Sequence, residues 1–221
     1  MLELIQLPYS PYCLVQSRLL AAARLKFKKV NIPCGDRSLI WKLTRRRYYQ
    51  VPVLKHGRTV VFETDEESQV IAKYLDAEFD LGLFPDELGG VQHLLWRYFE
   101  SEVEGVGFKL NDIYYQQNIP RPQWLDFIRH KERRFGRGCL EQWQSRQVEL
   151  LSDWAQVLQP CERMLRGKPF LLGERPLFVD FDLWGMLANF LYSGNYELPA
   201  GVPLLSDWYA RMRTVTLQTP A

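Results

Sequence analysis

The sequence predicts a small α/β domain followed by a larger all-helical domain. In the first eighty residues, short apolar runs typical of strands alternate with amphipathic segments typical of helices. The stretch 80–90 holds three glycines and a proline, which is typical of a linker. Beyond it, apolar residues recur at helical spacing. We therefore expect an α/β domain over residues 1–79, a linker over 80–89 and an all-helical domain over 90–221.

The α/β domain is predicted to run strand, helix, strand, helix, strand, strand, helix. Apolar residues over 2–7 indicate a buried strand that ends at Pro8, and Pro11 is typical of the first turn of a helix, here continuing to about residue 26. The other elements are expected at 28–32 (strand), 36–47 (weak, basic helix), 51–54 and 59–62 (strands about a tight turn) and 67–75 (helix). Further helices are expected near 90–104, 122–135, 139–166, 177–192 and 203–213.

Composition and charge exclude several classes of function. A formal net charge of +2 is too small for a nucleic-acid-binding domain, so we expect no nucleic-acid partner. No apolar run reaches the ~20 residues of a membrane-spanning helix, and no signal peptide is recognisable at the N-terminus. The four cysteines lie far apart, without metal-ligand spacing, which favours a reducing compartment and no metal site. We expect a cytoplasmic protein with no membrane partner.

Ser10 is the first candidate functional residue, because it stands between the first strand and the first helix. A helix N-terminus carries free N–H groups and a partial positive charge, which stabilise a thiolate placed against it. No histidine lies nearby in sequence to act as a base, so we expect the Ser10 hydroxyl to donate a hydrogen bond to a ligand thiolate rather than to be a nucleophile. The simpler interpretation of Ser10 alone is an ordinary helix cap.

Two further segments could bind a ligand. A cis bond between Val51 and Pro52 would leave the Val51 backbone free to pair with an extended ligand, although a trans bond is commoner. Glu67 and Ser68 begin the last helix of the α/β domain, where a hydroxyl and free N–H groups could hold a carboxylate and the glutamate an ammonium. An ordinary acidic helix cap is again the simpler interpretation.

Four motifs together resemble the glutathione transferase superfamily. They are Ser-Pro-Tyr-Cys at 10–13, Gln-Val-Pro-Val-Leu at 50–54, a match at 67–75 to the family's ES-x-x-I-x-x-YL pattern, and Phe-Leu-Leu-Gly at 170–173 followed by Val179-Asp180. The resemblance implies a thioredoxin-like N-terminal domain, an all-helical C-terminal domain and a homodimer. It also implies glutathione as co-substrate.

The resemblance further implies residue roles. Ser10 stands where serine-type members place the hydroxyl that stabilises the glutathione thiolate. Val51 would pair through its backbone with the cysteinyl part of glutathione, and Pro52 would be the cis-proline. Glu67 and Ser68 would hold the γ-glutamyl end. The remaining implied contacts are Gln50 and, for the glycyl carboxylate, one of Arg37, Lys42, Arg46 and Arg47.

A hydrophobic electrophile is expected between the two domains, a usual place for a small-molecule site. Aromatic rings cover apolar ligands, and a tyrosine hydroxyl can polarise an electrophile. The candidates to line this pocket are Tyr9, Tyr12, Tyr98, Phe108, Tyr114 and Tyr115, although the same side chains could pack in the core or at a dimer contact. The charged run 131–134 is interpreted as a solvated helix face with local ion pairs.

The sequence departs from the family pattern in two places. Leu177 stands three residues before Asp180, where the family often has Ser or Thr, so the hydroxyl cap is lost at a cost of about 1 kcal/mol unless another group substitutes. The acidic stretch 63–66 lengthens the approach to Glu67 and Ser68.

The function that these features favour is a cytosolic glutathione-dependent transferase of the detoxification type. Ether cleavage, a lyase reaction, dehalogenation or isomerisation would use the same thiolate. Two alternatives stay open. One is a glutathione-dependent thiol–disulfide oxidoreductase acting through Cys13, which occupies the resolving position of glutaredoxin-like relatives but is more typical of a buried small side chain. The other is a non-catalytic binding or structural protein of the same fold.

Overall fold

The N-terminal domain is built on a four-stranded sheet. The computed structural model describes residues 1–64 and 69–217. The strands are β1 (Leu2–Gln6), β2 (Phe27–Asn31), β3 (Val53–His56) and β4 (Thr59–Phe62), in the order β2-β1-β3-β4. β1 runs parallel to β2 and antiparallel to β3, and β3 and β4 form an antiparallel hairpin. The element order is the predicted one, with a helix between β1 and β2 as a parallel connection requires.

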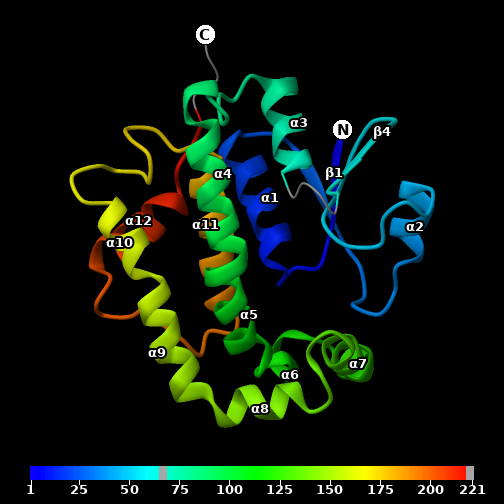
Figure 1. The fold of residues 1–221 in the computed structure, drawn as a ribbon. Helices are drawn as coiled ribbons and strands as arrows, with labels where there is room; N and C mark the ends of the chain where they lie inside the picture. The colour runs from blue at the N-terminus through cyan, green and yellow to red at the C-terminus, as the bar shows by residue number, and fades with distance from the viewer. Residues whose placement is uncertain (65–68, 218–221) are drawn as a thin grey trace.

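Helices cover both faces of the sheet (Figure 1). They are α1 (Pro11–Ala22), α2 (Ser38–Thr44) and α3 (Val70–Phe79). Successive strand residues point to opposite faces. Leu4 of β1 therefore packs in one cluster with Leu19 of α1 and Ile71 of α3, while its neighbour Ile5 packs with Ile40 of α2. The alternation along β1 thus separates α2 from the other two helices.

Helix ends in this domain differ from the predicted ones, because single residues adopt the left-handed conformation. α1 ends at Ala22 rather than near residue 26, since Arg24 has a φ of 54°. α2 is confined to seven residues by Arg45 and Arg46, with φ of 53° and 64°. α3 runs over Val70–Phe79, past the predicted end at residue 75, while its predicted start at residue 67 lies outside the described residues. The Val70 amide donates to the buried Glu63 carboxylate at 2.7 Å.

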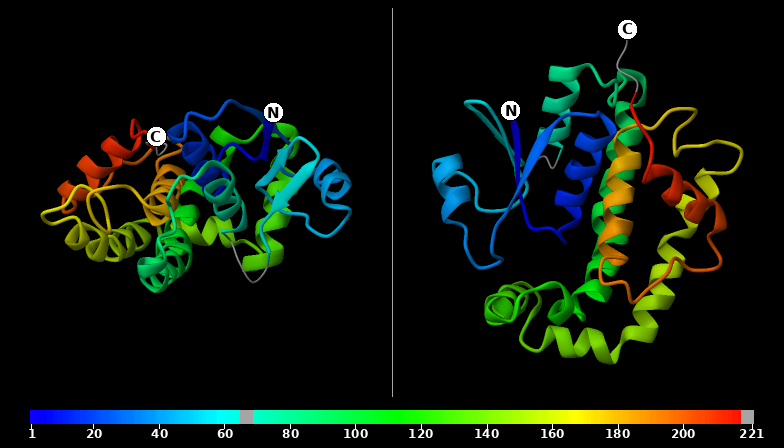
Figure 2. Two further views of the ribbon diagram at one scale, coloured as in Figure 1. Left: turned by 90° about the horizontal axis from the view of Figure 1, so that it is seen from above. Right: turned by 180° about the vertical axis from the view of Figure 1, so that it is seen from behind.

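The C-terminal domain is entirely helical. Its elements are η1 (Asp86–Leu88), α4 (Gly89–Tyr98), η2 (Phe99–Val103), α5 (Glu104–Asp112), α6 (Tyr115–Asn118), η3 (Arg121–Gln123), α7 (Trp124–Phe135), α8 (Cys139–Ser145), α9 (Gln147–Val157), α10 (Gln159–Met164), α11 (Phe178–Phe190) and α12 (Pro203–Met212). α4, the π-helical turn η2 and α5 form one long rod beside α11 (Figures 1 and 2). The predicted helix near 139–166 is three shorter helices.

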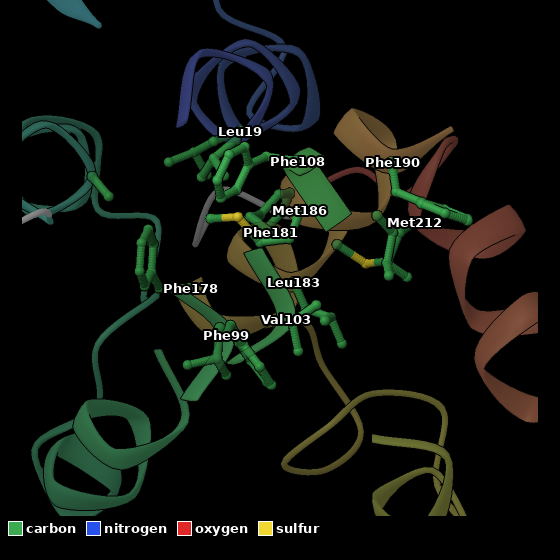
Figure 3. Close-up of a cluster of buried hydrophobic side chains, with 14 of the residues drawn as sticks. Leu19, Phe99, Val103, Phe108, Phe178, Phe181, Leu183, Met186, Phe190 and Met212 are labelled. Atoms are coloured by element: carbon green, nitrogen blue, oxygen red, sulfur yellow. The ribbon is translucent and has the colours of Figure 1, made fainter. Parts of the chain in front are cut away.

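α11 is the centre of the molecule. Nearly all of its residues are buried, and Figure 3 shows its Phe181, Leu183 and Met186 among side chains from the rod, from α1 and from α12. On the α1 side, a Cβ at Gly185 would lie 2.3 Å from Val15 Cγ2 and 2.9 Å from the Pro11 carbonyl oxygen. Glycine here lets α11 approach the first turn of α1, and this contact joins the two domains.

Asp180 compensates for the missing hydroxyl at the start of α11. Its carboxylate accepts the N–H groups of Leu177 at 2.9 Å and Leu171 at 3.0 Å, and the indole N–H of Trp208 at 3.0 Å. Leu177 makes no side-chain cap, as expected. The start of α11 is nevertheless stabilised, because the Asp180 carboxylate in its first turn accepts a hydrogen bond from the N–H of the cap residue Leu177.

Candidate functional site

A cavity of about 330 Å³ lies where the two domains meet. The sheet domain contributes the end of β1, the first turn of α1 and the loops before α2 and β3. The helical domain contributes α5, α7 and one residue of α11. In Figure 1, α7 lies below the N-terminal end of α1, and residues of both helices line the cavity. The cavity therefore occupies the interdomain position that the sequence predicts for a small-molecule site.

Ser10 lines this cavity at the N-terminus of α1. Its backbone is extended (φ −68°, ψ 129°), and its carbonyl accepts the first helical hydrogen bond, from Leu14 N–H at 2.9 Å. Its side chain makes no capping hydrogen bond to the helix, so the simpler interpretation of Ser10 as a side-chain cap is wrong. Pro11 has no N–H, which makes the amides of Tyr12 and Cys13 the first free donors of the helix.

Cys13 lies behind Ser10 and is only 1% exposed. Burial raises the pKa of the Cys13 thiol to about 12, with smaller opposing effects of the neighbouring Ser10 side chain and Leu7 backbone. At neutral pH the group is a thiol packed in the interior, which is a poor nucleophile.

The Val51-Pro52 bond is cis, as expected, and Val51 and Gln50 line the cavity. The ladder between β1 and β3 begins only at the pair Ile5 and Val53, two residues further on. Among the described residues, none forms a hydrogen bond with the Val51 backbone. One backbone edge therefore faces the cavity with its N–H and C=O available to an extended ligand.

The remaining predicted anchors of a tripeptide fall in two groups. Glu67 and Ser68 lie outside the described residues. Of the four basic candidates, Arg37 lines the cavity, and its guanidinium donates to the carbonyls of Pro33 at 3.1 Å and Asp36 at 3.3 Å. The other three, Lys42, Arg46 and Arg47, are exposed elsewhere on or after α2.

The predicted aromatic pocket is divided. Tyr9 and Tyr12 line the cavity, whereas the other three tyrosines pack within the helical domain. The Tyr98 hydroxyl donates to the Val157 carbonyl at 2.8 Å. The Tyr114 hydroxyl pairs with Gln147 at 3.1 Å. Tyr115 stacks on Phe127 with ring centroids 5.4 Å apart, and it is Phe127 that reaches the cavity.

A charged wall on α5 and α7 is the part of the site that sequence reasoning missed. It comprises Glu104, Asp112, Asp126, His130, Lys131 and Arg133. Lys131 pairs with the buried Asp112 at 2.5 Å, and its ammonium lies 4.7 Å from the Phe108 ring centroid. The pKa of Asp112 is raised by burial, and Lys131 opposes that shift. The predicted solvated face at 131–134 is therefore wrong for Lys131, since only 16% of its side chain is exposed.

The loop after β2 closes one side of the cavity against α7. Cys34 donates its amide to Gln123 Oε1 at 2.8 Å and its thiol to the Gln123 carbonyl at 3.4 Å. A Cβ at Gly35 would lie 2.4 Å from Asp126 Oδ2, so glycine allows this close approach. These contacts hold α7 beside the sheet domain.

Residues 1–64 and 69–217 hold no group of three or more His, Cys, Asp or Glu side chains arranged to bind a metal ion. Within these ranges, every helix is too short or too polar to cross a bilayer.

The fold and the cavity define a two-domain protein in which a thioredoxin-like domain packs against an all-helical domain. Two family models match in the same order along the chain: the glutathione S-transferase N-terminal domain over residues 4–82 and the glutathione S-transferase C-terminal domain over residues 123–211. Together they span about three-quarters of the sequence. The chain belongs to the glutathione S-transferase family.

Individual relatives agree with this assignment. A probable glutathione S-transferase, GSTU6 of Oryza sativa subsp. japonica, is 27% identical over 218 residues, covering 96% of this chain and 84% of the rice protein. The glutathione transferase GSTFuA3 of Phanerochaete chrysosporium superposes with a TM-score of 0.82 at 18% identity, covering 98% of both chains. A glutathione S-transferase of Ceriporiopsis subvermispora, solved with glutathione, gives 0.80 at 17% identity, covering 97% of both. The two fungal structures show the fold.

Proposed function

We propose that this protein is a glutathione-dependent transferase in which Ser10 stabilises the glutathione thiolate. The observation that carries the proposal is that three groups meet in one cavity: the Ser10 hydroxyl, the free N-terminus of α1 and the Val51 backbone. An extended tripeptide paired with Val51 presents its cysteinyl sulfur toward the start of α1. Membership of the family and the glutathione held by the fungal relative support the same ligand.

The chemistry follows from the groups around the sulfur. A thiol ionises more readily where donors and a positive dipole end stabilise its anion. The Ser10 hydroxyl and the amides of Tyr12 and Cys13 supply those donors, and the thiol proton leaves to solvent. The thiolate then attacks the electrophile, forming a C–S bond. Because the helix and the sheet already fix these donors, little reorganisation is needed when the charge forms.

The rest of glutathione is assigned to flanking groups. Arg37 is the cation for the glycyl carboxylate, because it alone of the four basic candidates lines the cavity. Gln50 stands beside Val51 as a further contact. The γ-glutamyl end is assigned to Glu67 and Ser68 by the family resemblance, and the acidic side chain suits its ammonium group.

Replacing Ser10 by alanine tests the proposal. Ser10→Ala removes one donor to the thiolate, so we expect kcat with glutathione and a reactive aryl halide to fall about 10²-fold. Ultraviolet titration of the bound thiol should show its pKa rising toward that of free glutathione. Cys13→Ala is the matched control, one turn further along α1, and should keep nearly all activity. Unchanged turnover in Ser10→Ala would remove Ser10 from the mechanism.

The same pair of variants addresses the two alternatives. A thiol–disulfide oxidoreductase would keep its activity in Ser10→Ala and lose it in Cys13→Ala. The burial of the Cys13 thiol and its raised pKa favour the transferase over this alternative. A non-catalytic protein would turn over no electrophile, and calorimetry would detect no glutathione binding if the cavity served another ligand.

We further propose that the protein acts as a cytoplasmic homodimer.

A further inference from the structure

Glu104 is the first residue of α5 and lines the same cavity as the start of α1. It follows directly on the π-helical turn η2. A π-turn holds one residue more than an α-turn, so it rotates the side chains that follow it relative to an uninterrupted helix. Glu104 is half-buried, and its carboxyl forms no hydrogen bond or ion pair with the residues that the structure describes.

Nearby charges do not neutralise Glu104 directly. The ammonium of Lys131, the cation with the largest effect on the Glu104 carboxyl, is held by Asp112 at 2.5 Å. The titratable and charged groups that face Glu104 are Lys131 and Arg134 of α7, Asp112 and Lys109 of α5, and Tyr12 of α1. Burial raises the pKa of Glu104 to about 7, with Lys131 and Arg134 opposing the shift and Asp112 adding to it. The group therefore exchanges a proton near neutral pH.

We propose that Glu104 is the general acid for the second substrate, and that the preferred electrophiles are those that must gain a proton after the sulfur adds, such as α,β-unsaturated carbonyl compounds. This inference rests on the proposed function. Ser10 and Glu104 line the same cavity from opposite domains, so an electrophile between them meets the thiolate on one side and the carboxyl on the other.

The proposed step balances without any further reactant. The glutathione thiolate forms a C–S bond to the β-carbon, and the electron pair of the carbon–carbon double bond moves toward the carbonyl to give an enolate. The Glu104 carboxyl transfers its proton to the α-carbon, and the resulting carboxylate regains a proton from solvent. The thiol releases one proton to solvent when it ionises, and Glu104 takes one proton from solvent afterwards, so the reaction consumes no net proton.

A cation-binding role is the competing interpretation of the same side chain. It requires an ionised carboxylate, whereas burial in the cavity favours the neutral carboxyl. A carboxyl that holds its proton up to neutral pH suits acid catalysis better than recognition of a positive charge.

The test compares two electrophiles in the variant Glu104→Gln. An aryl halide expels halide and needs no proton, whereas an enone must be protonated. We expect Glu104→Gln to lower kcat for the enone about 10²-fold and to change kcat for the aryl halide less than twofold. Glu102→Gln, at an exposed position two residues earlier, is the control and should leave both activities unchanged.

The pH profile gives a second readout. Since the protonated carboxyl is the active form, wild-type kcat for the enone should fall above about pH 7, the pKa of Glu104, and this limb should disappear in Glu104→Gln. Equal losses for both electrophiles, no loss for either, or a rise in KM confined to cationic electrophiles would overturn the inference. Wild-type protein inert toward the aryl halide would instead overturn the proposed function itself.

Discussion

The buried side chain of Asp180 connects three separate segments of the helical domain through hydrogen bonds. It is fully buried, and its carboxylate accepts hydrogen bonds from two loop amides and from Trp208 of α12. Burial raises the pKa of Asp180 to about 6, and the three donors oppose that shift. The residue joins the loop before α11, the start of α11 and the C-terminal helix.

Removing this acceptor should destabilise the fold strongly. Asp180→Ala leaves three buried N–H donors without a partner, and each such loss costs about 1–3 kcal/mol without full additivity. We expect the free energy of unfolding to fall by about 3–5 kcal/mol in urea denaturation. Asp207→Ala, on the exposed side of α12, should change it by less than about 0.5 kcal/mol. Similar shifts in both variants would contradict this account of Asp180.

Residues of the site differ in how visible they are in the sequence. Ser10, Val51 and Pro52 stand in contiguous motifs at element boundaries, where local rules for helix starts and proline predict special backbone geometry. Glu104 and Lys131 stand within ordinary helical sequence. Their roles depend on which helix lies opposite, and no local pattern carries that information.

At the scale of elements, the contact between α1 and α11 positions the site. Gly185 lets α11 approach the backbone of Pro11 and Val15, in the turn that follows Ser10. The Tyr9 carbonyl also accepts a hydrogen bond from Asn189 Nδ2 at 2.7 Å. The N-terminus of α1 is therefore fixed by α11 from the other domain, not by the sheet alone.

A methyl group at position 185 should disturb this contact. In Gly185→Ala the new Cβ meets backbone atoms of α1 at 2.9 Å, so the helices must separate. We expect a loss of about 1–3 kcal/mol in the free energy of unfolding and weaker glutathione binding in calorimetry. Gly105→Ala in α5 is the control, because its Cβ has open space and alanine favours a helix. A variant as stable as wild type, with unchanged affinity, would show that α1 does not depend on this approach.

The helix boundaries also show a limit of periodicity. The predicted helix near 139–166 has continuous helical spacing, yet it bends into three helices (Figure 1). Of these, α8 and α9 pack on α5, and α10 packs on α12. Apolar spacing reports which face is buried but not where the axis changes direction. The rod of α4, η2 and α5 is instead longer than predicted, because the helix expected near 90–104 continues to Asp112.

At the scale of the whole molecule, the surface supports the proposed homodimer. Leu94 is 70% exposed and Val91 is 44% exposed, both on α4. Exposed apolar side chains grouped on one helix are typical of an interface. We expect Leu94→Glu to shift the protein toward monomer in light scattering, because the charge would be buried without a partner.

The control for the dimer is Val148→Glu on α9, where the side chain is 84% exposed. Both substitutions exchange an exposed apolar group for the same charge, so only position differs. A monomeric wild-type protein, or equal behaviour of the two variants, would place the interface elsewhere or remove it.

The sequence by itself determined the two-domain architecture and the order of the elements in the sheet domain, because strand and helix periodicity and the turn residues are local properties of the chain. The resemblance to the family came from four motifs in the same sequence. The tertiary structure decided which side chains face the cavity. It packs Tyr98, Tyr114 and Tyr115 within the helical domain, away from the cavity, whereas Glu104 and the Lys131–Asp112 pair line the same cavity as Ser10. The physical reason is that helix packing sets these neighbours, through contacts such as Gly185 against α1 between residues far apart in the chain.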